Sequence, residues 1–263
     1  MALTGNAHGR NDEFLPNITA LGSILEKNGY SNTFILGSDA AFAGRDIYYR
    51  THGNYRLLDY NYAHDYGIIP QDYRVWWGFE DQRLYAWAKE EILRLSREES
   101  PFNLTMLTVD THHVGGYVCD LCTDEHQEQY ANVVVCASRQ LQDFISWVEQ
   151  QKFYENTTIV IVGDHPSMDP NFFRYLDKSF NRSLLNIFIN TAVTPLDEKN
   201  RQFSLYDLFP TTLAALGAEI RGNRLGLGVN LFSDEPTIIE EYSFNTVMTE
   251  LRRLSRFYNE NFW

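Results

Sequence analysis

Residues 156–170 read NTTIVIVGDHPSMDP, and an apolar run within them, Ile159 to Val162, stops at Gly163 directly before Asp164 and His165. Consecutive β-branched residues that end at a glycine are typical of a buried strand. Neighbouring side chains of a continuing strand point to opposite faces, but where the backbone turns both can reach one ion. We therefore predict that Asp164 and His165 bind a divalent cation. The alternative is that Asp164 caps a turn and His165 is a partly buried structural histidine.

Segments of helical and of strand character alternate on both sides of this stretch. Helical spacing of apolar residues is found in residues 18–30, 80–99, 129–151 and 205–217, and strands are predicted in residues 31–37, 103–113, 157–165 and 183–190. This alternation predicts an α/β fold, a mostly parallel sheet with helices on both faces. A further amphipathic helix is predicted over residues 245–263. The tyrosine-rich residues 55–81 are interpreted as a packed surface loop, with an aromatic wall or lid over a cleft as the alternative.

A second predicted strand end carries histidines, in the sequence DTHH of residues 110–113. In open α/β sheets, ligands bind beyond the carboxyl ends of the strands. We predict that His112 bonds to a substrate oxygen or protonates a leaving group, as histidine can near neutral pH. One of His112 and His113 is expected to face the cleft, and the other to be structural.

A third strand end is followed, after a short turn, by Arg45. Arginine holds a phosphate by two parallel hydrogen bonds, which lysine does less well, so Arg45 is a candidate phosphate ligand. The alternative is a surface arginine that pairs with Asp39 or Asp46.

The composition limits the classes of partner. The formal net charge is -13 and 44% of the 263 residues are hydrophobic, so general attraction to nucleic acid or to an anionic membrane is excluded while a large core is expected. No apolar run approaches the ~20 residues that span a bilayer. The first 20 residues lack the pattern of a signal peptide, and we expect the chain as given to be soluble.

Three cysteines, Cys119, Cys122 and Cys136, lie close together in the sequence. A disulfide between two of them is favoured if the protein is extracellular, and the sequence leaves the pairing open. The alternative is a zinc site, for which His113 and His126 are the nearby additional ligands.

With these residues identified, the chain resembles the sulfatase-like, alkaline-phosphatase superfamily. More narrowly, it is similar to the bacterial phosphoglycerol transferases, which are the lipoteichoic acid synthases and the enzymes that modify periplasmic glucans. The matching segments are LGSILEKNGYSNTFILGSDAAFAGRD, WGFEDQRLYAWA, LTVDTHHVGGY, ENTTIVIVGDH, LYDLFPTTLAALG and RLGLGVNLFS, which together cover residues 18 to 235. The resemblance implies a three-layer alkaline-phosphatase-like α/β fold.

The resemblance also implies a site and an activity. The family's divalent metal, usually Mn²⁺ with Mg²⁺ or Zn²⁺ as alternatives, is bound by an acidic residue, a nucleophilic Thr or Ser, and an Asp-His pair that falls on Asp164 and His165. The substrate-contacting histidine corresponds to His112, with His113 beside it, and the phosphate-contacting arginine to Arg45. The implied reaction moves glycerophosphate from phosphatidylglycerol to a glycan or teichoic acid hydroxyl, at the extracellular face of a bacterial membrane.

Two departures from the family pattern bear on this interpretation. Lipoteichoic acid synthases have a tryptophan two residues before the arginine, where this chain has Ala43. The strand with the acidic ligand, the nucleophile and the membrane helices are expected before Met1, and Thr4 is not assigned as the nucleophile. We therefore expect one domain over residues 1–263, truncated at its N-terminus and inactive as a fragment, with a helical extension over residues 237–263.

The alternative to a transferase is a non-catalytic binding or scaffold domain, which would cover its open sheet edge by a partner or a homodimer. Within the enzyme interpretation, a sulfatase or a phosphoethanolamine transferase is the other candidate.

Overall fold

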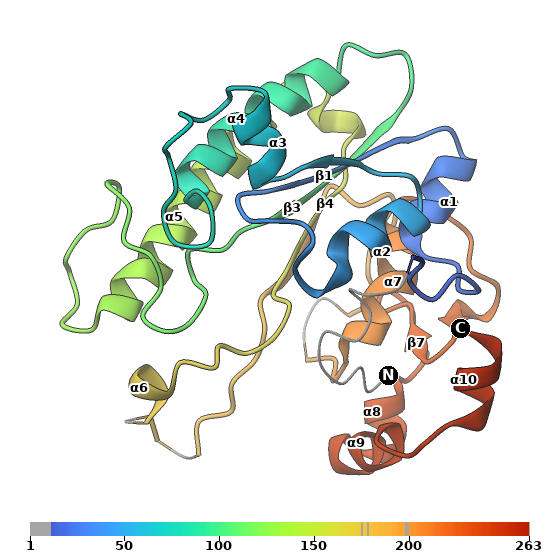
Figure 1. The fold of residues 1–263 in the computed structure, drawn as a ribbon. Helices are drawn as coiled ribbons and strands as arrows, with labels where there is room; N and C mark the ends of the chain where they lie inside the picture. The colour runs from blue at the N-terminus through green and yellow to red at the C-terminus, as the bar shows by residue number, and fades with distance from the viewer. Residues whose placement is uncertain (1–11, 175, 178, 198–199, 263) are drawn as a thin grey trace. The chain divides into compact units, whose positions relative to one another are not determined.

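The computed structural model describes residues 12–262, apart from residues 175, 178, 198 and 199 (Figure 1). Its contacts divide the described chain into two units. The larger unit contains residues 12–151, 167–181 and 257–262, and the smaller unit contains Lys152–Pro166 and Arg182–Arg256. Each unit is described by itself below.

The larger unit is built on a parallel sheet of three strands in the order β2-β1-β3. The strands are β1 (Ser31–Leu36), β2 (Arg56–Leu58) and β3 (Phe102–Leu107). In the register of the sheet, Leu36 of β1 lies opposite Leu107 of β3, so these two strands end side by side. Their carboxyl ends therefore deliver the following loops to one edge of the sheet.

Helices lie on both faces of this sheet (Figure 1), and the longest of them, α4 and α5, each bury an apolar stripe. The helices of this unit are α1 (Leu21–Lys27), α2 (Arg45–Thr51), α3 (Tyr60–Asp65), α4 (Asp81–Leu95) and α5 (Gln129–Glu149), together with the short α6 (Pro170–Phe173), which lies away from the sheet (Figure 1). The helix α4 packs on β1 and β3, while α2 packs on β2. Phe34, Leu36 and Tyr55 form a buried cluster against which Tyr49 of α2 packs, with the Phe34 and Tyr49 rings stacked at 3.8 Å between centroids.

The smaller unit contains two antiparallel strand pairs, β4 (Ile159–Val162) with β5 (Asn186–Ile189), and β6 (Arg224–Leu225) with β7 (Gly228–Val229). The helix α7 (Leu205–Ala215) packs on β7, where the buried Asp207 carboxylate accepts the N–H of Val229 at 2.8 Å. The smaller unit also contains α8 (Ile238–Tyr242) and α9 (Phe244–Leu251), whereas α10 (Arg256–Asn261) belongs to the larger unit from Phe257 on.

The α/β class and the helix-covered parallel sheet expected from the sequence are confirmed. Two details differ from the expectations. The strand β5 pairs with β4 in the antiparallel sense, and residues 245–261 form parts of two short helices, separated at residues 252–255, in place of one long helix. Among the described residues, no helix is both long enough and apolar enough to cross a bilayer.

Candidate active site

The Asp164–His165 pair follows β4 in the smaller unit, as the sequence predicted. The last ladder bond runs from the Gly163 N–H to the Leu185 carbonyl at 2.9 Å. The backbone then turns, and the Asp164 carboxylate accepts the His165 N–H through Oδ1 at 2.8 Å. Its other oxygen, Oδ2, lies 3.4 Å from Nε2 of the His165 ring. Both side chains are exposed to solvent, by 72% for Asp164 and 49% for His165, so His165 is not the partly buried histidine of the alternative interpretation, while the bond from Asp164 to the next N–H is the turn contact which that interpretation expects.

The donor atoms of this pair fit a divalent cation. Two ligands at about 2.1 Å from a metal, separated by a tetrahedral angle, lie roughly 3.4 Å apart. This matches the 3.4 Å between Asp164 Oδ2 and His165 Nε2. The other ring nitrogen, Nδ1, lies 3.1 Å from the Pro166 carbonyl oxygen. A proton on Nδ1 would therefore be donated to that carbonyl, and such a bond leaves the Nε2 lone pair available for a metal.

Arg45 lies in the larger unit, at the first position of α2, and it bonds to backbone in preference to carboxylate. Its Nη2 donates to the Asp39 carbonyl oxygen at 2.6 Å and to Ser38 Oγ at 3.3 Å. The Asp39 carboxylate accepts a backbone N–H from Ala41, and the Asp46 carboxylate pairs with Arg50 at 3.6 Å. The ion pairs that would make Arg45 a simple surface residue are therefore not formed.

The guanidinium of Arg45 is left with unused hydrogen-bonding capacity. Its Nε is buried and has no hydrogen-bond partner among the described residues. Burial lowers the pKa of Arg45, against the opposing influence of Asp39, but arginine stays protonated in proteins. A buried, charged donor without an acceptor is costly, so a bound anion would stabilise this group.

His112 follows β3 in a turn closed by its own N–H, which donates to the Val109 carbonyl at 2.9 Å. Its Nδ1 donates to the His113 carbonyl oxygen at 2.6 Å, so Nε2 is the nitrogen left for a substrate. The His113 ring stacks on the His112 ring, with 4.5 Å between centroids. The two histidines are therefore together, with His112 oriented by the backbone.

Arg45 and His112 are joined by two aromatic residues that were not singled out from the sequence. The Arg45 guanidinium lies 5.4 Å from the Phe42 ring centroid, Phe42 lies 5.9 Å from Trp77, and Trp77 lies 5.0 Å from His112. Residues 55–81 contain β2 and α3, so the prediction of a surface loop for the whole stretch is wrong, and Trp77 is its member in this row of rings. The exposed Trp76-Trp77 pair before Gly78 was the available signal in the sequence.

A buried carboxyl pair lies behind the histidines. Asp81, at the start of α4, accepts the N–H groups of Val109 and Asp110 at 2.8 and 3.0 Å. The Asp110 carboxyl is buried, and both of its oxygens lack a hydrogen-bond partner in the described part of the chain. Burial, and then the nearby Asp81, raise the pKa of Asp110.

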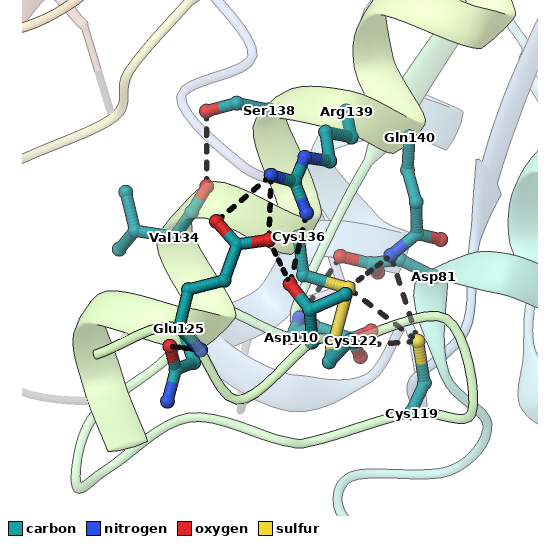
Figure 2. Close-up of a disulfide and its surroundings, with 12 residues drawn as sticks. Asp81, Asp110, Cys119, Cys122, Glu125, Val134, Cys136, Ser138, Arg139 and Gln140 are labelled. Atoms are coloured by element: carbon teal, nitrogen blue, oxygen red, sulfur yellow. Dashed lines mark hydrogen bonds and ion pairs between the residues drawn. A yellow bond between two sulfur atoms is a disulfide. The ribbon is translucent and has the colours of Figure 1, made fainter. Parts of the chain in front are cut away.

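The three cysteines lie beside this carboxyl pair (Figure 2). The structure pairs Cys122 with Cys136 in a disulfide and leaves Cys119 as a buried free thiol. Its sulfur lies 3.7 Å from the Cys122 sulfur and 3.9 Å from the Cys136 sulfur. The bridge ties the loop after the histidines to α5, and the disulfide interpretation holds in place of the zinc site.

Comparisons with solved structures place this fold in a known class. A protein of the alkaline phosphatase superfamily from Vibrio parahaemolyticus matches with a TM-score of 0.61 at 17% identity, over 84% of this chain and 55% of that one. The lipoteichoic acid synthase LtaP from Listeria monocytogenes matches with a TM-score of 0.57 at 19% identity, over 86% of this chain and 58% of that one. The fold is therefore that of the alkaline phosphatase superfamily.

Sequence comparisons show the family. The sulfatase family model matches residues 2–218, and the chain belongs to the sulfatase family. Phosphoglycerol transferase I of Xanthomonas campestris pv. campestris (strain B100) is 32% identical over 236 residues, which cover 88% of this chain and 33% of that protein. The phosphoglycerol transferase I of Escherichia fergusonii is 33% identical over 243 residues, covering 88% and 30%. The chain thus spans about a third of the length of the curated relatives it matches.

Proposed function

We propose that this domain serves in metal-dependent transfer of a glycerophosphate group, from a phosphatidylglycerol-type lipid to a hydroxyl of a glycan or teichoic acid. The sulfatase and alkaline phosphatase superfamily is generally dependent on divalent metals. The observation that carries the proposal is the Asp164–His165 donor pair, whose 3.4 Å separation suits one cation. The proposed place of action is the outer face of a bacterial cell membrane.

Each predicted residue has a role in this proposal. Asp164 and His165 hold the metal, with Mn²⁺ favoured and Mg²⁺ or Zn²⁺ as alternatives; a bound divalent metal polarises a phosphoryl oxygen as a Lewis acid. Arg45 binds the non-bridging phosphate oxygens through its unused N–H groups. His112, whose Nδ1 is engaged by the His113 carbonyl, uses Nε2 to bond to the ester oxygen.

The proposed reaction exchanges one P–O bond for another at the same phosphorus. The P–O bond to diacylglycerol breaks, and a new P–O bond forms between the same phosphorus and the acceptor oxygen. The acceptor's hydroxyl proton ends on the diacylglycerol oxygen, and His112 is placed to deliver a proton to that leaving oxygen. In the family mechanism, a nucleophile carries the glycerophosphate between the two steps.

The test is binding of sn-glycerol 1-phosphate, measured by calorimetry on the chain and its variants. Hydrogen bonds to charged groups contribute about 1.5–3 kcal/mol, so Arg45→Ala should weaken binding by roughly tenfold to a hundredfold. His112→Ala should weaken it by about tenfold. Arg50→Ala is the matched control, because its side chain is 65% exposed and pairs only with Asp46 among the described residues. Binding that is absent, or that is equal in all variants, would contradict the proposal.

A further inference from the structure

The ring row Phe42–Trp77–His112 leaves two of its members open to solvent. Phe42 is 53% exposed and Trp77 is 41% exposed, although large aromatic side chains gain most from burial. The row begins at the Arg45 guanidinium, 5.4 Å from the Phe42 centroid, and ends at His112, 5.0 Å from Trp77. Two polar groups suited to phosphate therefore have an exposed aromatic surface between them.

The backbone holds Trp77 in this place. Val75 and Gly78 exchange hydrogen bonds of 2.8 and 2.9 Å, so Trp77 lies in a tight turn. Gly78 forms a bridge with Ser38, at the end of β1, and a Cβ on Gly78 would come 2.0 Å from the Gly37 carbonyl oxygen. Ser38 also accepts a hydrogen bond from Arg45. One short segment after β1 thus fixes both the indole and the guanidinium.

The charge next to the rings selects the chemistry of the group they would contact. The guanidinium of Arg45 already lies over the Phe42 ring. An ammonium headgroup on these rings would compete with the Arg45 guanidinium for the Phe42 ring, which is a penalty for a cationic ligand. The C–H groups of an uncharged polyol carry no such penalty, and they pack on an aromatic face while the hydroxyls stay in water.

We infer that Trp77, supported by Phe42, is the side chain that determines headgroup specificity, by packing on the carbon chain of an uncharged polyol phosphate held by Arg45 and His112. This inference rests on the proposed function, and it adds a specificity-determining residue to that site. Trp77 contacts the ligand away from the reacting bond.

The neighbouring Trp76 provides a matched control. It is 40% exposed, much like Trp77, and within the described part of the chain no ring contact joins it to this row. Removing either indole takes away a similar exposed apolar area, but only Trp77→Ala removes the surface between Arg45 and His112.

The experiment measures Kd by calorimetry for three probes, sn-glycerol 1-phosphate, ethanolamine phosphate and inorganic phosphate. The protein is compared with Trp77→Ala, Trp77→Phe and Trp76→Ala, with circular dichroism to verify folding. Trp77→Ala should weaken the binding of sn-glycerol 1-phosphate by about threefold to tenfold and the binding of inorganic phosphate by less than about twofold. Trp77→Phe retains a ring, so it should keep affinity within about twofold even if the alanine variant is less stable.

Each outcome decides between the two proposals. If the unaltered chain prefers glycerol phosphate and Trp77→Ala alone loses this preference, the inference is supported. It is overturned if Trp77→Ala keeps the preference, if Trp76→Ala has the same effect, or if ethanolamine phosphate binds as tightly as glycerol phosphate. If the unaltered chain binds none of the three probes, the proposed function itself fails.

Discussion

At Asp110, a carboxyl is buried in the larger unit while both of its oxygens lack a hydrogen-bond partner among the described residues. Burial, and then Asp81, raise its pKa well above the ordinary aspartate value. The unfolded chain releases this proton near the ordinary aspartate pKa of about 3.9. The folded state therefore keeps this proton at pH values where the unfolded chain has lost it, and the free energy of unfolding falls as the pH rises above about 4.

Asp110→Asn should remove this pH-dependent loss, because the amide is uncharged at every pH. We expect the variant to be more stable than the unaltered chain at pH 8 by about 1–3 kcal/mol, with a smaller difference at pH 5. Urea unfolding at both values measures it. The exposed Asp72 is the control position, where the same substitution should change little. If Asp110→Asn instead lowers the stability at pH 8, the charged carboxylate must have a partner.

At the scale of elements, the Cys122–Cys136 disulfide connects the loop after the histidines to α5. Cys119 lies 3.9 Å from the Cys136 sulfur and can take the place of Cys122. We expect Cys122→Ser, refolded under oxidising conditions, to form a Cys119–Cys136 bridge, which mass spectrometry of unreduced peptides detects. The double variant Cys119→Ser/Cys122→Ser should lose about 3 kcal/mol of stability, as expected for a closed loop of this length. Two free thiols in the single variant would contradict this expectation.

Another connection fixes α8 within the smaller unit. The Glu240 carboxylate pairs with Arg201 at 2.9 Å and also accepts the N–H groups of Gln202 and Thr237. The hydrogen bond from Arg201 is the main cause that lowers the pKa of Glu240 to about 2. The ionised Glu240 carboxylate therefore stabilises the folded state at pH values above the ordinary glutamate pKa of about 4.3, and this stabilisation is lost as the pH falls towards 2.

Glu240→Gln should lower the free energy of unfolding by about 1–3 kcal/mol at pH 7, and the difference should shrink at pH 3. Glu241→Gln is the neighbouring control. Its more exposed pair with Arg224 should contribute about 0–1 kcal/mol. Equal losses in the two variants, measured by urea unfolding, would mean that the additional bonds of Glu240 add nothing.

Some residues of the candidate site could be predicted from the sequence and others could not. Arg45 and His112 were predicted as site residues because each follows a strand, and β1 and β3 end in register. The role of Asp164 and His165 as metal ligands stays a prediction. Because the two residues are neighbours in the chain, only the position of the end of β4 had to be predicted to place them together at a strand end. Trp77 could not be assigned, since its place depends on the bridge between Gly78 and Ser38, distant in sequence. The free Cys119 likewise follows from packing, because all three cysteines lie within reach of one another.

For the whole molecule, the sulfatase family and the alkaline phosphatase fold are shown, and the transfer of glycerophosphate is proposed. A metal that binds the folded chain stabilises it by mass action. We therefore expect the melting temperature to rise with the Mn²⁺ concentration. At a hundredfold excess of free Mn²⁺ over Kd, the free energy of unfolding should increase by about 2.7 kcal/mol. Asp164→Ala should lose this response. A melting temperature that rises equally in this variant would place the binding elsewhere.

Metal binding by Asp164 and His165 can be measured directly by a calorimetric titration of the chain with Mn²⁺. It should be compared with Asp164→Ala and His165→Ala, and with two exposed control substitutions, Asp72→Ala and His126→Ala. We expect saturable binding at one site, weakened at least about tenfold in Asp164→Ala and in His165→Ala and unchanged in the two controls. Identical binding in all five proteins, or no binding in any, would contradict the assignment of Asp164 and His165 as metal ligands.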